Sequence, residues 1–329
     1  MKLATLPDGT RDGRLVVVSR DQRRCAGVAD IAPSLQRALE SWDALEAPLR
    51  RRAAELERGG VDGAAPFEPR QALAPLPRAY QWLDGSAFMT HLRLMALAGK
   101  RDPEAATSRT APLMYQGGSD SFLGPAADIV LPSEDDGIDF EAEVGVILDD
   151  TPMGVAAQDA LRHVRLLVLI NDVSLRHLSP VEFKSGFGWV QAKPSTSFGP
   201  LAVTPDELGP AWNGGRVHCP VRIRLNGQPF GHPDAGAMKF SFADLVHHAA
   251  RTRSLCAGTI IGSGTISNDA YQAVGSACIA ERRAIETIEQ GEPRTPYMTF
   301  GDRVEIDMAG DDGTSLFGAI DQVVRRHQS

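Results

Sequence analysis

Two glutamates at alternate positions of an expected strand place the strongest constraint on how this chain folds. Glu141 and Glu143 lie within the stretch 138–148, and strand geometry would point both side chains to one face, about two rises of ~3.3 Å apart. The apolar run Leu166–Ile170 is followed closely by Asp172. If Asp172 joins the glutamates, carboxylates ~4 Å apart repel by ~4 kcal/mol at an effective dielectric constant of about 20. A hard divalent cation is the simplest counter-charge, so the pattern predicts a metal site.

Each of these acids also has a simpler interpretation. A Glu-x-Glu pair in a strand is typical of a solvated outer face, and the pair Asn171-Asp172 is typical of a turn. The glutamates alone therefore do not establish a metal site. Their combination with Asp172 favours one.

Composition limits the class of protein. A chain of 329 residues can bury a large core and suits one large domain with a smaller one, while 32 glycines and 22 prolines indicate many turns and short strands. The net charge of -8 without a basic stripe argues against a nucleic-acid partner. No apolar run approaches ~18 residues, and no signal-peptide core follows Met1, so we expect a cytoplasmic protein without a membrane partner.

The organisation along the chain predicts two domains. Residues 1–73 would form a small N-terminal domain, because two strand-like runs (14–19 and 25–29) precede an amphipathic helical stretch, 34–58, that forms one helix or two. Residues 59–77, rich in glycine, alanine and proline, are typical of a linker. We therefore expect the main domain to span residues 74–329.

The main domain is predicted to be rich in strands. We expect one helix at 86–97 and strands at 138–148, 164–170, 217–225 and 303–308. Asn226-Gly227 is a strong signal for a two-residue hairpin turn. Together these elements predict an α+β fold in which strands dominate.

An aspartate and a histidine form a second group of candidate site residues. Asp84 precedes His91 by seven residues at an expected helix start. Asp84 could simply cap that helix, and a single histidine is more often structural than catalytic. Histidine is nevertheless the side chain best suited to take a proton from water near neutral pH.

Two glycine-containing loops supply further candidates. Lys193 is the only charged residue between Ser185 and Thr204, which favours a positioned ammonium over a solvated one. Thr265 lies in a run of glycines and hydroxyls, 257–268, where close backbone approach could hold an oxyanion. Neither loop contains a Walker lysine or a dinucleotide-binding spacing.

Taken in order, these segments resemble the fumarylacetoacetate hydrolase family. The resemblance covers about residues 75–324 and is carried by Asp-Phe-Glu-Ala-Glu-Val (139–144), Asn-Asp-Val-Ser-x-Arg (171–176), Lys-Pro-Ser (193–195) and Ser-Gly-Thr-Ile-Ser (263–267). It implies a mixed β-roll or β-sandwich catalytic domain behind a small N-terminal α/β domain. Metal-dependent members cleave, decarboxylate, hydrate or isomerise β-dicarbonyl and related keto acids.

The resemblance also implies roles for individual residues. The expected metal ligands are Asp84, Glu141, Glu143 and Asp172, holding Mg2+ or Ca2+, with Mn2+ also suitable. The expected catalytic residues are His91, Lys193 and Glu281, of which Glu281 would orient His91. The expected substrate contacts are Tyr115, Lys100, Thr265 and Ser86. Members of this family usually form homodimers, so the resemblance also implies a homodimer.

Departures from the family pattern concern the substrate pocket. Ser86 stands where fumarylacetoacetases of eukaryotic type have a tyrosine, and Ser179 stands where they have a glutamine. Both changes suggest a bacterial-type variant, and they affect the substrate more than the reaction class. Lys100 stands where the fumarylacetoacetase subgroup carries an arginine.

Three functions therefore remain open from the sequence. The first is hydrolytic C–C cleavage of a β-diketone acid, as when fumarylacetoacetate gives fumarate and acetoacetate in tyrosine and homogentisate breakdown. The second is decarboxylation, tautomerisation or isomerisation of oxaloacetate-like or hydroxydienedioate acids. The third is binding of a metal or keto acid without catalysis, against which the presence of His91 and Lys193 argues.

Overall fold

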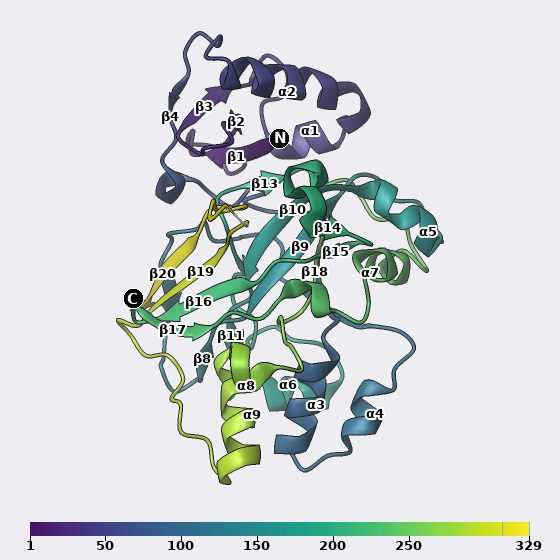
Figure 1. Ribbon diagram of the computed structural model, residues 1–329, viewed down its shortest axis with the longest axis vertical. Coiled ribbons are helices and arrows are strands. Elements are labelled where there is room, and N and C mark those ends of the chain that lie inside the picture. Colours follow the sequence, from purple (N-terminus) through teal and green to yellow (C-terminus); the bar gives the residue numbers. More distant parts are fainter. Residues whose placement is uncertain (311, 329) are drawn as a thin grey trace.

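A computed structural model of the protein describes residues 1–310 and 312–328 (Figure 1). Within that part of the chain, the strands are β1 (Lys2–Leu6), β2 (Arg14–Val18), β3 (Arg24–Gly27), β4 (Ala65–Pro66), β5 (Trp82–Ser86), β6 (Leu113–Gly117), β7 (Ile129–Leu131), β8 (Ile138–Asp139), β9 (Ala142–Leu148), β10 (Val164–Asn171), β11 (Ser174–Leu175), β12 (Ser197–Phe198), β13 (Ala202–Val203), β14 (Trp212–Asn213), β15 (Arg216–Val217), β16 (Val221–Leu225), β17 (Gln228–Gly231), β18 (Ile260–Gly262), β19 (Arg303–Met308) and β20 (Ile320–Arg326). The α-helices are α1 (Leu35–Leu39), α2 (Trp42–Glu57), α3 (Met89–Ala98), α4 (Pro103–Thr107), α5 (Ala157–Ala160), α6 (Ser179–Ser185), α7 (Phe242–Ala249), α8 (Tyr271–Val274) and α9 (Ile279–Gln290). Short 3-10 turns cover η1 (Pro69–Gln71), η2 (Leu161–His163), η3 (Pro205–Ala211) and η4 (Ala235–Ala237).

Beside two small two-stranded sheets, β11-β8 and β14-β15, two large sheets organise the described residues. The larger one has 11 strands in the order β4-β3-β2-β1-β13-β10-β9-β18-β5-β6, with β12 also paired to β10. The smaller one has five strands in the order β17-β16-β19-β20-β7. Most pairs are antiparallel, but β5 runs parallel to β18 and β7 parallel to β20. The predicted α+β class, rich in strands, is confirmed.

The N-terminal strands continue the sheet of the main domain. Lys2 pairs with Val203 and Leu3 with Ala202, so β1 adds directly to β13. Helices α1 and α2 lie over β1–β4 at the top of Figure 1. One hydrophobic cluster joins Leu3 and Val17 of this region to Ile170 of β10. The expected boundary near residue 73 stays a prediction, because the two regions share both a sheet and a core.

The central strands explain how acids come to lie inside the protein. Every residue of β9 is buried, and β9 lies between β10 and β18. The apolar runs of β9 and β10 are typical of strands covered on both faces. Glu143 sits within this run, opposite Ile170. It is therefore held in the interior rather than on a solvated outer face.

Several predicted elements differ in their bounds. The expected strand 138–148 divides into β8 and β9, and Glu141 lies between them. The expected helix 86–97 begins only at Met89, and Asp84 lies in β5 rather than at a helix start. The reason is tertiary, since Trp82 and Leu83 are buried where β5 pairs with β18 and β6.

The structure confirms the predicted helical stretch 34–58, the hairpin turn at Asn226-Gly227 and the strand 303–308. The helical stretch 34–58 forms two helices, α1 and α2. Asn226 and Gly227 have φ values of 51° and 74° and connect β16 to β17, as a type I′ hairpin requires. The expected strand 303–308 is β19, whereas 217–225 is interrupted between β15 and β16. No helix in the described residues has the length and apolar character to span a membrane.

We predict that Leu3→Ala destabilises the whole protein. Leu3 is fully buried in the cluster shared by β1 and β10, so its truncation should lower the free energy of unfolding by ~3 kcal/mol. Urea denaturation measures the loss. Leu97→Ala is the matched control, because Leu97 is 42% exposed, and its cost should stay below ~1 kcal/mol. Equal losses in the two variants would contradict a shared core.

Candidate metal and active site

Three carboxylates from separate elements meet in the interior. Asp84, Glu143 and Asp172 each offer one oxygen, and these oxygens lie within 4.8 Å of one another. Asp84 comes from β5, Glu143 from β9, and Asp172 from the residue after β10. Their exposed fractions are 6%, 0% and 0%. We call these three residues the acidic triad.

A glycine makes room for the acidic triad. Gly262 of β18 pairs with Asp84 on one side and with Gly145 of β9 on the other. A Cβ atom at position 262 would collide with Oδ1 of Asp84 and would lie 3.1 Å from Oε2 of Glu143. Because position 262 of β18 is a glycine, no side chain at this position fills the space between Asp84 and Glu143.

Within the acidic triad, the negative charges of Asp84 and Glu143 are poorly compensated. Burial and the charge of Asp172 raise the pKa of Asp84 to about 8. Burial and the charge of Asp84 raise the pKa of Glu143 well above its usual value. Among the residues that the structure describes, no donor reaches either carboxylate oxygen of Glu143. A buried carboxylate without a partner is costly. Three converging oxygen ligands with this deficit fit a hard divalent cation.

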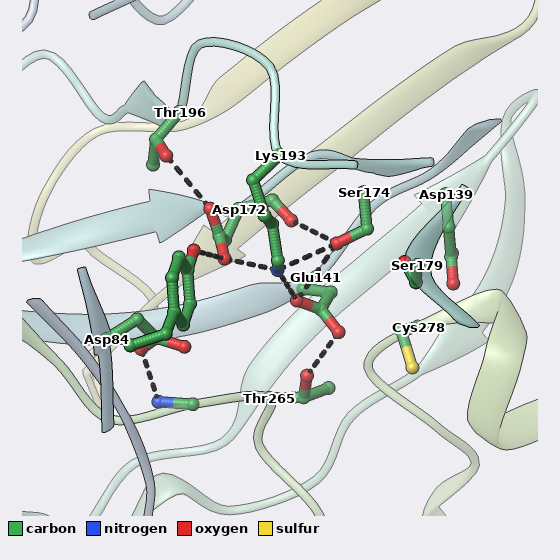
Figure 2. A network of polar contacts seen from close by, with 12 residues as sticks. Asp84, Asp139, Glu141, Asp172, Ser174, Ser179, Lys193, Thr196, Thr265 and Cys278 are labelled. Carbon is green, nitrogen blue, oxygen red and sulfur yellow. Dashed lines mark hydrogen bonds and ion pairs between the residues drawn. The ribbon is translucent and has the colours of Figure 1, made fainter. Parts of the chain in front are cut away.

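Glu141 has different partners from the acidic triad (Figure 2). One oxygen accepts from Arg176 at 2.6 Å and from Thr265 at 2.9 Å, and the other accepts from Lys193 at 2.6 Å. Burial acts in the opposite direction, but Arg176 and Lys193 hold the pKa of Glu141 below its usual value. Glu141 is therefore a charged neighbour of the acidic triad in this structure, and its role as a fourth ligand stays a prediction.

Lys193 connects Glu141 to the acidic triad. Its Nζ donates to Glu141, to Oδ2 of Asp172 at 2.5 Å and to Ser174 at 2.8 Å. Burial opposes the charged form, but Asp172 and Glu141 raise the pKa of Lys193 above its usual value. The ammonium also lies 5.2 Å from the ring centre of Tyr115. Figure 2 shows it between Asp172 and Glu141.

Asp172 is fixed by two hydroxyl groups. Tyr115 of β6 donates its hydroxyl hydrogen to Oδ2 of Asp172 at 2.6 Å, and Thr196 donates to Oδ1 at 2.8 Å. Burial and the charge of Asp172 raise the pKa of Tyr115, so the phenol remains a donor. Trp189 packs against Tyr115 with ring centres 4.9 Å apart.

His91 and Glu281 form a pair on two adjoining helices. His91 lies in the first turn of α3, Glu281 lies in the first turn of α9, and Nδ1 of the imidazole is 2.8 Å from Oε2 of the carboxylate. Glu281 is fully buried. A carboxylate accepts the hydrogen on Nδ1, which leaves Nε2 with a lone pair that can take a proton.

Two expected substrate contacts are placed less centrally. Ser86 ends β5 on the same face as Asp84, since the two residues are two positions apart. Lys100 is exposed beyond the C-terminal end of α3, the opposite end of that helix from His91. Ser179 donates its hydroxyl hydrogen to the carbonyl of Leu175, within its own segment. Lys100 thus lies away from the cluster that contains Tyr115 and Thr265, whereas Figure 2 draws Ser179 among the residues of the polar network.

The structure brings to the site several residues for which the sequence predicted no role, namely Asp139, Ser174, Arg176, Trp189 and Thr196. Arg176 binds Asp139 at 2.8 Å as well as Glu141, while Ser174 and Trp189 contact Lys193. Ser174 and Arg176 belong to the motif Asn-Asp-Val-Ser-x-Arg, and Asp139 opens the motif that contains both glutamates. The two motifs indicated that these residues matter. Their hydrogen-bonding partners could not be predicted, because the bonds join segments that are distant in the sequence.

Comparison with known families identifies the chain. The fumarylacetoacetate (FAA) hydrolase C-terminal domain matches residues 81–325, and the fumarylacetoacetase N-terminal domain 2 matches residues 1–78. The chain belongs to the fumarylacetoacetate hydrolase family. Members of this family similar to the present chain include hydrolases, tautomerases and isomerases.

Two curated relatives illustrate this range. A 2,4-didehydro-3-deoxy-L-rhamnonate hydrolase of Sphingomonas sp. (strain SKA58) is 30% identical over 159 residues, which are 47% of this chain and 53% of that enzyme. The mitochondrial oxaloacetate tautomerase fahd2 of Xenopus laevis is 24% identical over 265 residues, 71% of this chain and 81% of that protein. The chain spans about half the length of the first curated relatives it matches.

Solved structures share the fold. A maleylpyruvate hydrolase of Sphingobium sp. SYK-6, in complex with manganese (II) ion and pyruvate, has a TM-score of 0.66 with 17% identity, and all of both chains is covered. A fumarylacetoacetate hydrolase of Exiguobacterium antarcticum has a TM-score of 0.67 with 19% identity, covering 99% of this chain and 100% of that one. At these identities the likeness establishes the fold alone.

We predict that Glu143→Gln has opposite effects with and without a divalent cation. In chelator-treated protein, replacing this carboxyl group by a neutral amide should raise Tm by about 2–6 °C, because folding then no longer has to bury the charge of Glu143 or neutralise it by proton uptake. In wild type, Mg2+ or Mn2+ at 100 times its Kd should add ~2.7 kcal/mol of stability, and the variant should lose that gain. Thermal unfolding with and without cation measures both effects.

Glu292→Gln is the control, because Glu292 is exposed. It should leave both Tm values unchanged. A Glu143→Gln protein that is less stable without cation and still gains from Mg2+ or Mn2+ would contradict the metal site.

Proposed function

We propose that this protein is a metal-dependent hydrolase that cleaves a C–C bond in a β-diketone acid, with fumarylacetoacetate as the first candidate substrate. The observation that carries the proposal is the buried acidic triad beside a positioned lysine and a histidine–carboxylate pair. Such a cleavage has three requirements, and these groups can meet each of them. The acidic triad can hold a cation that binds a dioxo acid, the histidine can take a proton from water, and the lysine can donate hydrogen bonds to an oxyanion.

The acidic triad would hold the cation, and Glu141 is the candidate fourth ligand. Mg2+, Ca2+ and Mn2+ all suit oxygen ligands. Such an ion would supply Lewis acidity to the two oxygens of a 1,3-dicarbonyl group. We also propose that the protein forms a homodimer, as expected from the family.

His91 would act as the base. Glu281 holds Nδ1 of the imidazole, so Nε2 accepts a proton from a water molecule as the water oxygen attacks the carbonyl carbon next to the bond that breaks. Burial of Glu281 keeps its carboxylate fixed on the ring. The imidazolium formed in this step carries the proton that is returned later.

Lys193 and Thr265 would stabilise the negative charge that develops on the attacked carbonyl oxygen. Both side chains now donate to Glu141, so each would exchange that partner for the substrate. The tetrahedral adduct then collapses, and its C–C electron pair leaves on the adjacent carbon as an enolate. The imidazolium proton returns to that carbon, and the products are a carboxylic acid and a shorter keto acid.

A second candidate function uses the same residues without water attack. The Xenopus laevis relative matches 71% of this chain and is an oxaloacetate tautomerase, and one structural neighbour from Mycobacterium smegmatis is a 5-carboxymethyl-2-hydroxymuconate delta-isomerase. In this reading His91 moves a proton between carbon atoms or between carbon and oxygen. Tautomerisation or isomerisation of a hydroxydienedioate or oxaloacetate-like acid is therefore the alternative.

We predict that incubation with fumarylacetoacetate and Mg2+ or Mn2+ in 18O-labelled water releases fumarate containing one solvent oxygen. The label distinguishes hydrolysis from proton transfer, because only water attack places solvent oxygen in the new carboxylate. Mass spectrometry of the products measures it. Rapid enol–keto conversion or decarboxylation of oxaloacetate, with no cleavage of any diketone acid, would reject the hydrolase.

His91→Asn tests the base in the same assay. Loss of the base should lower kcat by about 10²- to 10⁴-fold, while cation binding at the acidic triad stays unchanged. His327→Asn is the control, since His327 is exposed near the end of the described chain. Full turnover in the His91→Asn protein would remove His91 from the mechanism.

A further inference from the structure

A fully buried aspartate outside the proposed catalytic set holds the start of helix α9. Asp139 ends β8, and its carboxylate accepts hydrogen bonds from the backbone N–H groups of Ile279 at 2.7 Å and Ala280 at 2.9 Å. These are the first two residues of α9. The first N–H groups of a helix have no partner within it, so Asp139 satisfies two of them from a distant segment. Figure 2 places Asp139 on the side of Glu141 away from Lys193.

The same carboxylate is joined to the charged cluster through one guanidinium. Nε of Arg176 donates to Oδ2 of Asp139 at 2.8 Å, and Nη2 of Arg176 donates to Glu141 at 2.6 Å. Burial raises the pKa of Asp139, and Arg176 and the N–H of Ala280 act against that rise. Three N–H groups donate hydrogen bonds to this carboxylate, that of Ile279 to Oδ1 and those of Ala280 and Arg176 to Oδ2. Both oxygens of Asp139 therefore act as acceptors.

The position of α9 decides where the partner of His91 lies. Glu281 directly follows Ala280, and its N–H is capped by Sγ of Cys278 at 3.3 Å. Its carboxylate reaches Nδ1 of His91 at 2.8 Å. A shift of the first turn of α9 would therefore move the carboxylate that orients the imidazole.

We propose that Asp139 is a positioning residue that fixes helix α9 to the Arg176–Glu141 pair, so that Glu281 keeps His91 aligned with the acidic triad. Asp139 touches none of the residues that would contact substrate, and it acts through α9 and Arg176. The structural part of the inference stands on the contacts alone, and its kinetic part rests on the proposed function.

The isosteric change Asp139→Asn tests this role. An asparagine has one acceptor oxygen. With that oxygen in the Oδ2 position, Ala280 and Arg176 keep their acceptor and the NH2 group faces the N–H of Ile279, whereas in the other orientation the NH2 group faces both Ala280 and Arg176. At least one hydrogen bond to the start of α9 is therefore lost without a change in side-chain volume. Asp135→Asn is the matched control, because Asp135 is exposed and four residues upstream.

The first measurement follows the His91 ring by 15N-edited NMR, with the signal assigned from its absence in His91→Asn. In wild type and Asp135→Asn, the ring should show one tautomer with hydrogen on Nδ1. In Asp139→Asn, the signal should change to averaged tautomers. A ring signal identical to wild type in folded Asp139→Asn protein would overturn the proposal, whatever reaction the enzyme catalyses.

The second measurement is a double-mutant cycle with Glu281→Gln. Asp139→Asn alone should lower kcat by about 10- to 100-fold with KM within about threefold, as expected for a misplaced base. In the Glu281→Gln background, Asp139→Asn should cause little further loss, because the two residues act as one unit. Independent, multiplying losses would overturn the proposal.

Arg176→Lys covers the case in which Asp139→Asn does not fold. The lysine keeps a positive charge but cannot bridge Asp139 and Glu141 with two nitrogens of one planar group. Its loss in kcat should be non-additive with Glu281→Gln in the same way, and additive losses would reject the proposal. If wild type converts none of the diketone acids, the proposed function fails, and the ring signal still decides the role of Asp139.

Discussion

The structure depends on a concentration of negative charge in the interior of a sheet. Asp84, Glu143 and Asp172 converge in the buried interior, and no donor within the described part of the chain reaches the carboxylate of Glu143. Burying such charges costs several kcal/mol per ion unless a cation compensates them. Burial of the apolar residues of β9 and β10, on both sides of the acids, offsets this cost in the free energy of folding. The arrangement is therefore suited to binding a cation rather than to stability.

The neighbouring groups follow from that charge. Lys193 is drawn between Asp172 and Glu141, and the hydroxyls of Tyr115 and Thr196 fix Asp172. Glu141, with Arg176 and Lys193 beside it, remains ionised. The pKa values of Asp84 and Glu143 are raised by burial and by the charges of the neighbouring acids. The site thus has two parts. The charge of Glu141 is balanced by Arg176 and Lys193 within the protein, whereas Asp84 and Glu143 have no such partner among the described residues.

The convergence of the candidate residues was easier to predict from the sequence than the local structure around them. Strand alternation and motif order pointed to Glu143, Asp172 and Lys193, because these signals are local. Asp84 was expected at a helix start, since pairing of β5 with β18, nearly 180 residues later, leaves no trace in a short window. Arg176 and Asp139 gained roles only through contacts with α9 and Glu141. Long-range hydrogen bonds of this kind cannot be read from spacing.

Anomalous diffraction from crystals soaked in Mn2+ tests the central claim most directly. The account predicts one strong manganese peak at which oxygens of Asp84, Glu143 and Asp172 converge, and no such peak in Glu143→Gln crystals treated identically. A peak only at surface carboxylates, or triad side chains that face apart around an empty interior, would contradict it.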